Sequence, residues 1–208
     1  MKALLRLLAP ILLSLFAALP AQAAVTITFW SHELGNSFPH AFVTLRGIPD
    51  AGGPPVDRNF GFTAKAVTPA LLFGPVPGRL DIAKPGYIDG STAQFSVVLT
   101  DQQYAAVVAL ATAWDDKGPD STYNLQTHNC VHFVEEAARL VGLTKVDFPG
   151  LMKKPRSYLQ AVAQANASQL IVVDQHGKEY LAALPPIVAT PTAATPTVPV
   201  PDKTAATN

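Results

Sequence analysis

The apolar pattern of this chain changes its period once, near Thr100. Before that point, apolar and polar residues alternate in short runs, which indicates strands with one buried face. These runs cover residues 25–30, 40–46, 59–63 and 94–99. After Thr100, apolar residues recur every three or four positions, as in amphipathic helices. Because the strands follow one another with no helix between them, the pattern predicts an α+β fold in which an antiparallel sheet packs against helices.

Two helices are predicted clearly after the change of period. Thr100 and Gln103 form a capping-box pattern, and the apolar residues that follow predict a helix over 101–114. A second helix is predicted over 130–141, where Gly142 provides a natural end.

Other segments have weaker patterns. The Gly/Pro-rich stretch 69–90 predicts a long surface connection with short extended pieces. Residues 157–169 are expected to form a further helix, whereas 170–173 and 178–182 are expected to form a closing hairpin with His176 at its exposed tip.

The N-terminal end differs from this central part. Residues 1–23 contain Lys2 and Arg6, continue as an apolar run and finish with Ala-Gln-Ala, the small-x-small form of a signal peptidase site. They predict a cleaved secretory signal. A membrane anchor is the alternative, but Pro10 and Pro20 leave an apolar run shorter than the ~20 residues that a span requires.

The C-terminal end is also distinct. Residues 185–208 are rich in Pro, Thr and Ala, contain no aromatic residue and predict a disordered tail. The folded domain is therefore predicted to cover 24–184. With the signal removed, the protein is expected to be secreted or periplasmic, without a stable membrane span.

Charge and cysteine content narrow the possible functions. The chain has 15 Lys and Arg against 15 Asp and Glu, so it lacks the basic field of a nucleic-acid-binding protein. The chain has one cysteine, Cys130, in the first turn of the second predicted helix. Unpaired N–H groups and the helix dipole at this position favour a thiolate, which can attack acyl carbonyls with the help of a nearby imidazole. The alternatives are a small buried apolar residue or a disulfide between chains.

The pattern Tyr-Asn-Leu-x-x-x-Asn-Cys-x-His-Phe-Val at 123–134 opens a helix and follows a strand that begins with a histidine. This arrangement resembles the circularly permuted papain-like (NlpC-type) thiol hydrolase superfamily, in its lecithin retinol acyltransferase-like branch, over about Trp30 to Gly142. The resemblance implies Cys130 as the nucleophile and His40 as general base and acid. It places a third polar residue on the strand after the His strand, which here offers Asn59 to fix the imidazole tautomer; a two-residue Cys-His site is the alternative.

The remaining histidines near this motif have simpler expected roles. His32 is a rival base, but its predicted position in a loop favours a surface or site-rim role. His132 follows Cys130 by two positions, lies on a different helix face and is expected to pack against the core or form a hydrogen bond with it. His128 is expected to support the turn. His128, Cys130 and His132 are spaced by two, and side chains at this spacing on a helix do not converge on one ion, so no metal site is expected. No organic cofactor is expected either.

Taken together, these features predict an exported cysteine hydrolase or acyltransferase that acts on amide or ester bonds of a peptide or acyl substrate. Export suggests cell-wall peptides of peptidoglycan as the substrate. The alternative is a catalytically silent binding module of the same fold. Four aromatic residues near the motif either line a cleft or fill the core: Trp30, Phe38, Trp114 and Tyr123.

Overall fold

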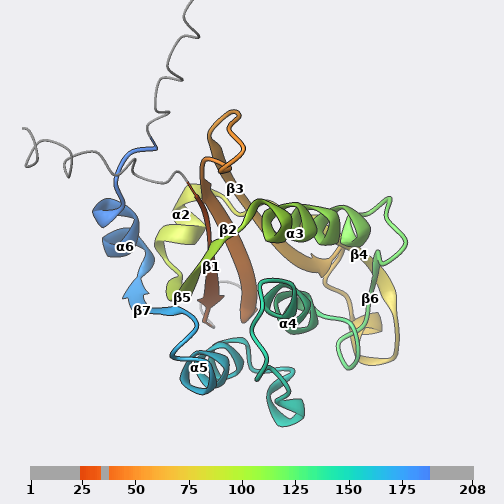
Figure 1. Ribbon diagram of the computed structural model, residues 1–208. Helices are drawn as coiled ribbons and strands as arrows, with labels where there is room; N and C mark the ends of the chain where they lie inside the picture. Colours follow the sequence, from red (N-terminus) through yellow and green to blue (C-terminus); the bar gives the residue numbers. More distant parts are fainter. Residues whose placement is uncertain (1–23, 34–37, 188–208) are drawn as a thin grey trace, which may run out of the picture.

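The structure, a computed structural model, describes residues 24–33 and 38–187. Within these ranges the chain forms an α+β fold: seven strands make one antiparallel sheet, accompanied by five α-helices and two short 3₁₀-helices (Figure 1). The predicted signal at 1–23 and most of the predicted tail, 188–208, lie outside the described residues. No helix in the described part of the chain is long and apolar enough to cross a membrane.

The strand order along the sheet is β6-β4-β3-β2-β1-β5-β7, and each pair is antiparallel. The strands in chain order are β1 (Val25–His32), β2 (His40–Gly47), β3 (Val56–Ala64), β4 (Val76–Asp81), β5 (Thr92–Leu99), β6 (Thr122–Tyr123) and β7 (Ile171–His176). The helices are α2 (Pro85–Asp89), α3 (Asp101–Trp114), α4 (Cys130–Leu140), α5 (Pro155–Ala165) and α6 (Gly177–Ala183), with 3₁₀-helices η1 (Pro69–Leu72) and η2 (Pro149–Leu151).

Alternation along the strands gives the sheet two different sides. On β2, Ala41, Val43 and Leu45 face α3, α4 and α5, which cover what is here called the helix side (Figure 1). His40 and Phe42 face the other way, toward what is here called the opposite side. Helices α2 and α6 pack on the opposite side.

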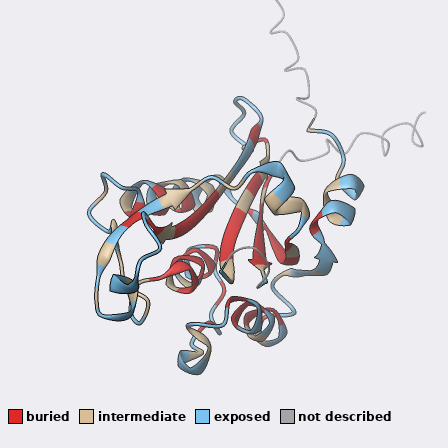
Figure 2. Ribbon diagram, turned by 180° about the vertical axis from the view of Figure 1, so that it is seen from behind, coloured by how far each residue is buried: buried red, intermediate tan, exposed pale blue. Residues whose placement is uncertain are grey.

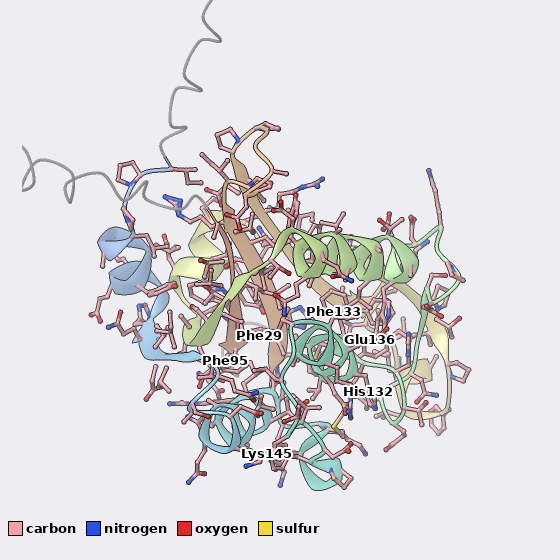
Figure 3. The ribbon with its side chains drawn as sticks, viewed as in Figure 1. Phe29, Phe95, His132, Phe133, Glu136 and Lys145 are labelled. Carbon is pink, nitrogen blue, oxygen red and sulfur yellow. The ribbon has the colours of Figure 1, made fainter. Side chains whose placement is uncertain are left out.

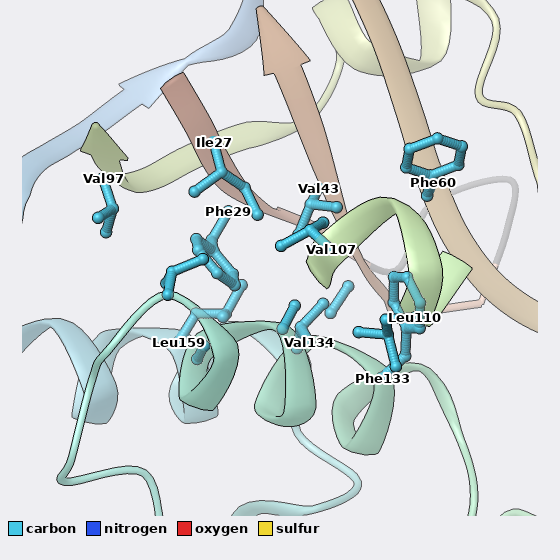
Figure 4. Packing of buried hydrophobic residues seen from close by; sticks show 14 of the residues in the cluster. Ile27, Phe29, Val43, Phe60, Val97, Val107, Leu110, Phe133, Val134 and Leu159 are labelled. Atoms are coloured by element: carbon cyan, nitrogen blue, oxygen red, sulfur yellow. The ribbon is translucent and has the colours of Figure 1, made fainter. Parts of the chain in front are cut away.

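The main hydrophobic core lies on the helix side. Val107 of α3, Val134 of α4 and Leu159 of α5 pack against Ile27 and Val43 of the central strands (Figure 4). Buried residues gather on the middle strands and on the faces of the helices that meet them (Figure 2). Each such side chain contributes about 1.5–3 kcal/mol when it leaves water, so this side of the sheet holds the helices in place.

A smaller aromatic cluster forms the opposite side. The rings of Trp30 and Phe42 stack at 5.8 Å, and the ring of Tyr180 from α6 meets Trp30 edge-on at 5.5 Å. The indole N–H of Trp30 donates to Thr44 Oγ1 at 2.9 Å, so its polar atom is satisfied within the protein. This cluster holds the first residues of β2, where His40 lies.

The sequence-based helix predictions are confirmed where local signals are strong. Helix α3 spans 101–114, and Thr100 and Gln103 form the expected capping box. Helix α4 begins at Cys130 as predicted and ends one residue earlier than expected, at Leu140. The stretch predicted as a long connection contains β4 and α2, and β4 pairs with β3 over four residues.

The predicted closing hairpin is wrong. Strand β7 pairs with β5, and residues 178–182 lie in α6. Lys, Glu, Leu and Ala in this segment have high helix propensity, and Tyr180 and Leu181 pack on the opposite side of the sheet. His176 is therefore the last residue of β7 and the N-cap of α6, not a hairpin tip.

Helix α5 also differs from its predicted range, because it ends at Ala165. The next residue, Asn166, is buried, and its side chain forms hydrogen bonds with both backbone groups of Lys145, at 3.1 and 2.8 Å. These bonds satisfy the amide of Asn166 in a capping position and stop the helix there.

Gly142 ends α4 in the way that its sequence position predicts. Its φ is +93°, its N–H donates to the carbonyl of Arg139, and the N–H of Leu143 donates to the carbonyl of Ala138. This is the Schellman arrangement, which requires a left-handed residue after the helix.

Replacing Gly142 with alanine is expected to lower the free energy of unfolding by about 1 kcal/mol, because an L side chain is strained at this φ. Urea unfolding followed by circular dichroism measures the change. Gly150→Ala is the matched control, because Gly150 has no positive φ and no heavy atom would contact the added Cβ. Equal midpoints for the two variants would contradict the role given to Gly142.

Candidate active site

The start of α4 is held by Asn129. Its side-chain oxygen accepts hydrogen bonds from the N–H groups of Val131 at 2.7 Å and His132 at 3.4 Å. Its amide group donates to the carbonyls of Leu125 and Met152, both at 2.9 Å. Asn129 thus caps the helix and joins it to the segments before and after, so the first turn of α4 has a fixed position against the sheet.

Cys130 is the first residue of α4 and is 7% exposed. Burial raises the pKa of its thiol to about 11, although backbone N–H groups of Ala41, Cys130 and Val131 reach the sulfur and lower the pKa in part. The expectation that the helix start favours a thiolate is therefore wrong for the resting protein, because desolvation of the charge outweighs the N–H groups.

His40 is the first residue of β2, and its imidazole lies on the opposite side of the sheet. Its ring is stacked beside Phe42 at 6.1 Å, and its Nε2 occupies the space that a side chain on Gly61 would need. Burial lowers the pKa of His40 to about 4; the charge of Asp81 raises it, and His32 lowers it further. The imidazole is therefore neutral at neutral pH.

The structure brings Cys130 to the peptide group that follows His40, but it does not pair the thiol with the imidazole. The N–H of Ala41 reaches the sulfur from the helix side, whereas the His40 ring lies over Gly61. No hydrogen bond joins Cys130 and His40 in the described part of the chain. His40 and Ala41 are neighbours on β2, so their side chains face opposite sides of the sheet. Cys130 packs in the same cluster as Ala41, and the thiol and the imidazole therefore lie on opposite sides of β2.

Asn59 has a different set of partners from the one expected. Its side-chain oxygen accepts a hydrogen bond from the N–H of Ala83 at 2.6 Å, and its amide group donates to the Ala83 carbonyl at 3.2 Å. The register places Asn59 across from Thr44, well along β2 from His40. Both polar atoms of Asn59 therefore hold the segment before α2, and no hydrogen bond among the described residues joins Asn59 to His40.

Two residues near His40 were not found by sequence reasoning. Gly61 lies under the imidazole, and Asp81 is its direct partner in the β3–β4 register. Asp81 also forms an ion pair with Arg79 at 3.1 Å. A glycine between two phenylalanines in a strand signals close approach of another group and could have indicated Gly61. Asp81 had no such signal, because β4 lies in a stretch without a strand pattern.

His32 lies closer to His40 than its predicted loop position allowed. It is the last residue of β1 and lies directly across from His40 in the register. Its Nδ1 is 3.0 Å from the hydroxyl of Ser91, and its ring stacks on Tyr87 at 4.0 Å. His32 is thus held as part of the rim of the His40 site.

His128 supports the turn before α4, as the sequence predicted, whereas His132 takes part in the capping of α4 and not in the core. The Nε2 of His128 donates to the Asp120 carbonyl at 3.1 Å, and its ring stacks on Trp114 at 3.8 Å. The Nδ1 of His132 accepts from the N–H of Asn129 at 3.3 Å, and the residue lies on α4 away from the sheet (Figure 3). No group of three His, Cys, Asp or Glu side chains able to hold a metal occurs among the described residues.

The aromatic residues divide between core and surface. Trp30 and Trp114 are buried and fill the two cores, whereas Phe38 is largely exposed. Tyr123 is partly buried, and its hydroxyl group and the Cys130 thiol interact electrostatically. The core interpretation therefore holds for both tryptophans.

No family model, curated protein or solved structure matches this chain.

The stability of the protein is expected to fall as the pH is lowered from 6.5 toward 4. In the unfolded chain His40 takes up a proton near its ordinary pKa of 6.5, whereas in the folded protein its pKa is about 4. The unfolded state therefore binds more protons in this range, which costs the fold up to about 3 kcal/mol.

Urea unfolding at pH 7, 5.5 and 4.5 tests this expectation. His40→Gln should remove most of the loss, whereas His176→Gln, at an exposed histidine, should retain it. The same pH dependence in His40→Gln and in the unmodified protein would contradict the burial of a neutral His40.

Proposed function

We propose that this chain is a cysteine hydrolase or acyltransferase of permuted papain-like form, acting on amide or ester bonds. Cys130 is the nucleophile, and His40 is the general base and acid. One observation carries the proposal: the sulfur lies in the first turn of α4 and is reached by N–H groups both from that turn and from Ala41, the residue after His40. The order in the chain, His strand before Cys helix, supports the permuted form.

The reaction begins with both groups neutral. The sulfur of Cys130 attacks the carbonyl carbon of the substrate while its proton passes to the imidazole of His40. Negative charge then develops on the carbonyl oxygen, which the N–H of Cys130 can stabilise, since the next N–H groups of α4 are held by Asn129. The imidazolium gives its proton to the leaving group, and water or a second acceptor takes the acyl group from the thioester.

This mechanism requires the imidazole to approach the sulfur when the substrate binds. Catalytic hydrogen bonds are often long or misaligned in the free enzyme and tighten in the complex. The proposed step therefore requires the His40 ring to leave its buried place over Gly61 and to reach the sulfur around the end of β2, where His40 is the first residue.

We assign to Asp81 the role that the sequence gave to Asn59; it acts on His40 through its charge, and no hydrogen bond among the described residues joins the two. Its carboxylate raises the pKa of His40, so it favours the imidazolium that forms during the reaction. Gly61 permits this interaction. It pairs with Asp81 across the β3–β4 register, and because it has no side chain, the His40 ring fits beside it.

The substrate class follows from the expected export. A secreted or periplasmic enzyme of this chemistry meets the peptides of the cell wall, and we propose peptidoglycan cross-bridges or stems as its substrates. A catalytically silent binding module is the second candidate, which the burial of Cys130 and the raised pKa of its thiol favour.

Acylation of Cys130 by p-nitrophenyl acetate tests the proposal, with intact mass spectrometry as the readout at neutral pH. His40→Ala is expected to slow acylation by about 100-fold, because general base catalysis is lost. His176→Ala, at an exposed histidine far along the chain, is the control and should acylate like the unmodified protein. Equal rates for His40→Ala and the control would favour the silent binding module.

Replacing Asp81 with asparagine is expected to lower the pKa of His40 further, because the charge that raises it is removed. An NMR titration of the His40 imidazole measures the change without any substrate. Arg79→Gln is the matched control: it removes the partner of Asp81 but keeps the carboxylate, and so it should not lower the pKa. An unchanged His40 titration in Asp81→Asn would exclude the positioning role.

A further inference from the structure

The connection between β3 and β4 presents three large apolar side chains to solvent. Phe73 is 87% exposed and Leu72 is 73% exposed, the highest values for large apolar residues in the described part of the chain, and Val67 is 63% exposed. Single exposed apolar residues are common on protein surfaces, whereas a group of them marks a site of interaction. Residues 66–75, here called the apolar loop, are therefore a candidate interaction surface.

The apolar loop and the start of β4 carry no charge. Residues 66–78 include no Asp, Glu, Lys, Arg or His. The nearest cations in the sequence are both engaged: Lys65 forms an ion pair with Asp116 at 3.2 Å, and Arg79 forms one with Asp81 at 3.1 Å. The loop therefore offers a partner apolar contact and no free charge of its own.

The backbone of the loop has few N–H groups left without a partner. Pro69 has no N–H, and the N–H groups of Leu71 and Phe73 donate to the carbonyls of Thr68 and Ala70, at 3.1 and 3.0 Å, within the turns of η1. Unpaired backbone groups are costly in an apolar medium, because no water is present to satisfy them. Internal bonding at η1 therefore lowers the cost of placing this loop in such a medium.

We propose that the apolar loop binds the surface of a phospholipid bilayer, with Leu72 and Phe73 inserted beneath neutral headgroups. Apolar side chains at a membrane surface bind by leaving water for the acyl chains. A protein partner fits less well, because a specific interface involves about 20–30 residues a side, whereas these side chains belong to one short connection. The engagement of Lys65 and Arg79 in ion pairs favours neutral over anionic lipid.

Tryptophan fluorescence with phosphatidylcholine vesicles tests the proposal. The exported chain without residues 1–23 is used, because their apolar run would itself bind lipid. Phe73→Trp is expected to shift its emission to the blue with vesicles and to be quenched by lipids brominated in their acyl chains. The native Trp30 and Trp114 are buried and give a constant background. Ile171→Trp, at an exposed position of β7 at the far end of the sheet from β4, should not be quenched (Figure 1). Absence of quenching in Phe73→Trp would overturn the proposal.

Co-sedimentation with the same vesicles measures the affinity. Leu72→Ser combined with Phe73→Ser is expected to weaken binding by about tenfold or more, because two apolar side chains no longer leave water. Ile171→Ser combined with Val172→Ser is the matched control: it removes two adjacent exposed apolar side chains of β7 and should bind like the unmodified chain. Added salt should change the affinity little, because the loop carries no free charge.

Three results of these measurements would contradict the proposal. The first is equal binding by the two double variants, and the second is a requirement for anionic lipid. The third is a dimer, seen by light scattering, that the Leu72 and Phe73 variant abolishes, since the loop would then be an interface between copies of the chain. Circular dichroism checks that each variant is folded. Because the loop contains neither Cys130 nor His40, none of these results bears on the acyl-transfer activity.

Discussion

The alternation of residues along β2 is the constraint on which the rest of the site depends. Ala41 faces α4, and its N–H reaches the sulfur of Cys130, whereas His40 faces the aromatic stack that Phe42 begins. Pairing with β1 on one edge and β3 on the other fixes this register. If the register of β2 shifted by one residue, its side chains would exchange sides. The contact of Ala41 with Cys130 and the stacking of His40 beside Phe42 would then both be lost.

Burial then determines the charge of the two candidate catalytic groups. Three N–H groups at the sulfur of Cys130 are the arrangement that stabilises a thiolate, yet the thiol is so far from water that its pKa rises to about 11. The same effect keeps His40 neutral, with a pKa of about 4. In the proposed reaction, two neutral groups would transfer the proton during the attack on the substrate, whereas an exposed Cys-His pair can hold a thiolate at rest.

The elements predicted correctly are those whose signals are local. Helix α3 was predicted over its full length because its capping box and its apolar spacing lie within the helix itself. The same is true of the start of α4 and of Gly142 at its end. Strand β4 was predicted only as one of the short extended pieces in 69–90. Its place in the sheet was not predicted, because this Gly/Pro-rich segment has no alternation of its own and pairs with β3 in the folded protein. Residues 178–182 had an ambiguous pattern, and packing against the sheet made them a helix.

For the site, the sequence by itself determined that the single cysteine begins a helix and that a histidine begins an earlier strand. These are properties of short segments, and they follow from capping residues and from periodicity. Only the tertiary structure decided that Asn59 binds Ala83, that Gly61 and Asp81 lie beside His40, and that the thiol is protonated. The reason is physical: strand register and desolvation depend on contacts between segments far apart in the chain, and a sequence pattern describes only the segments themselves.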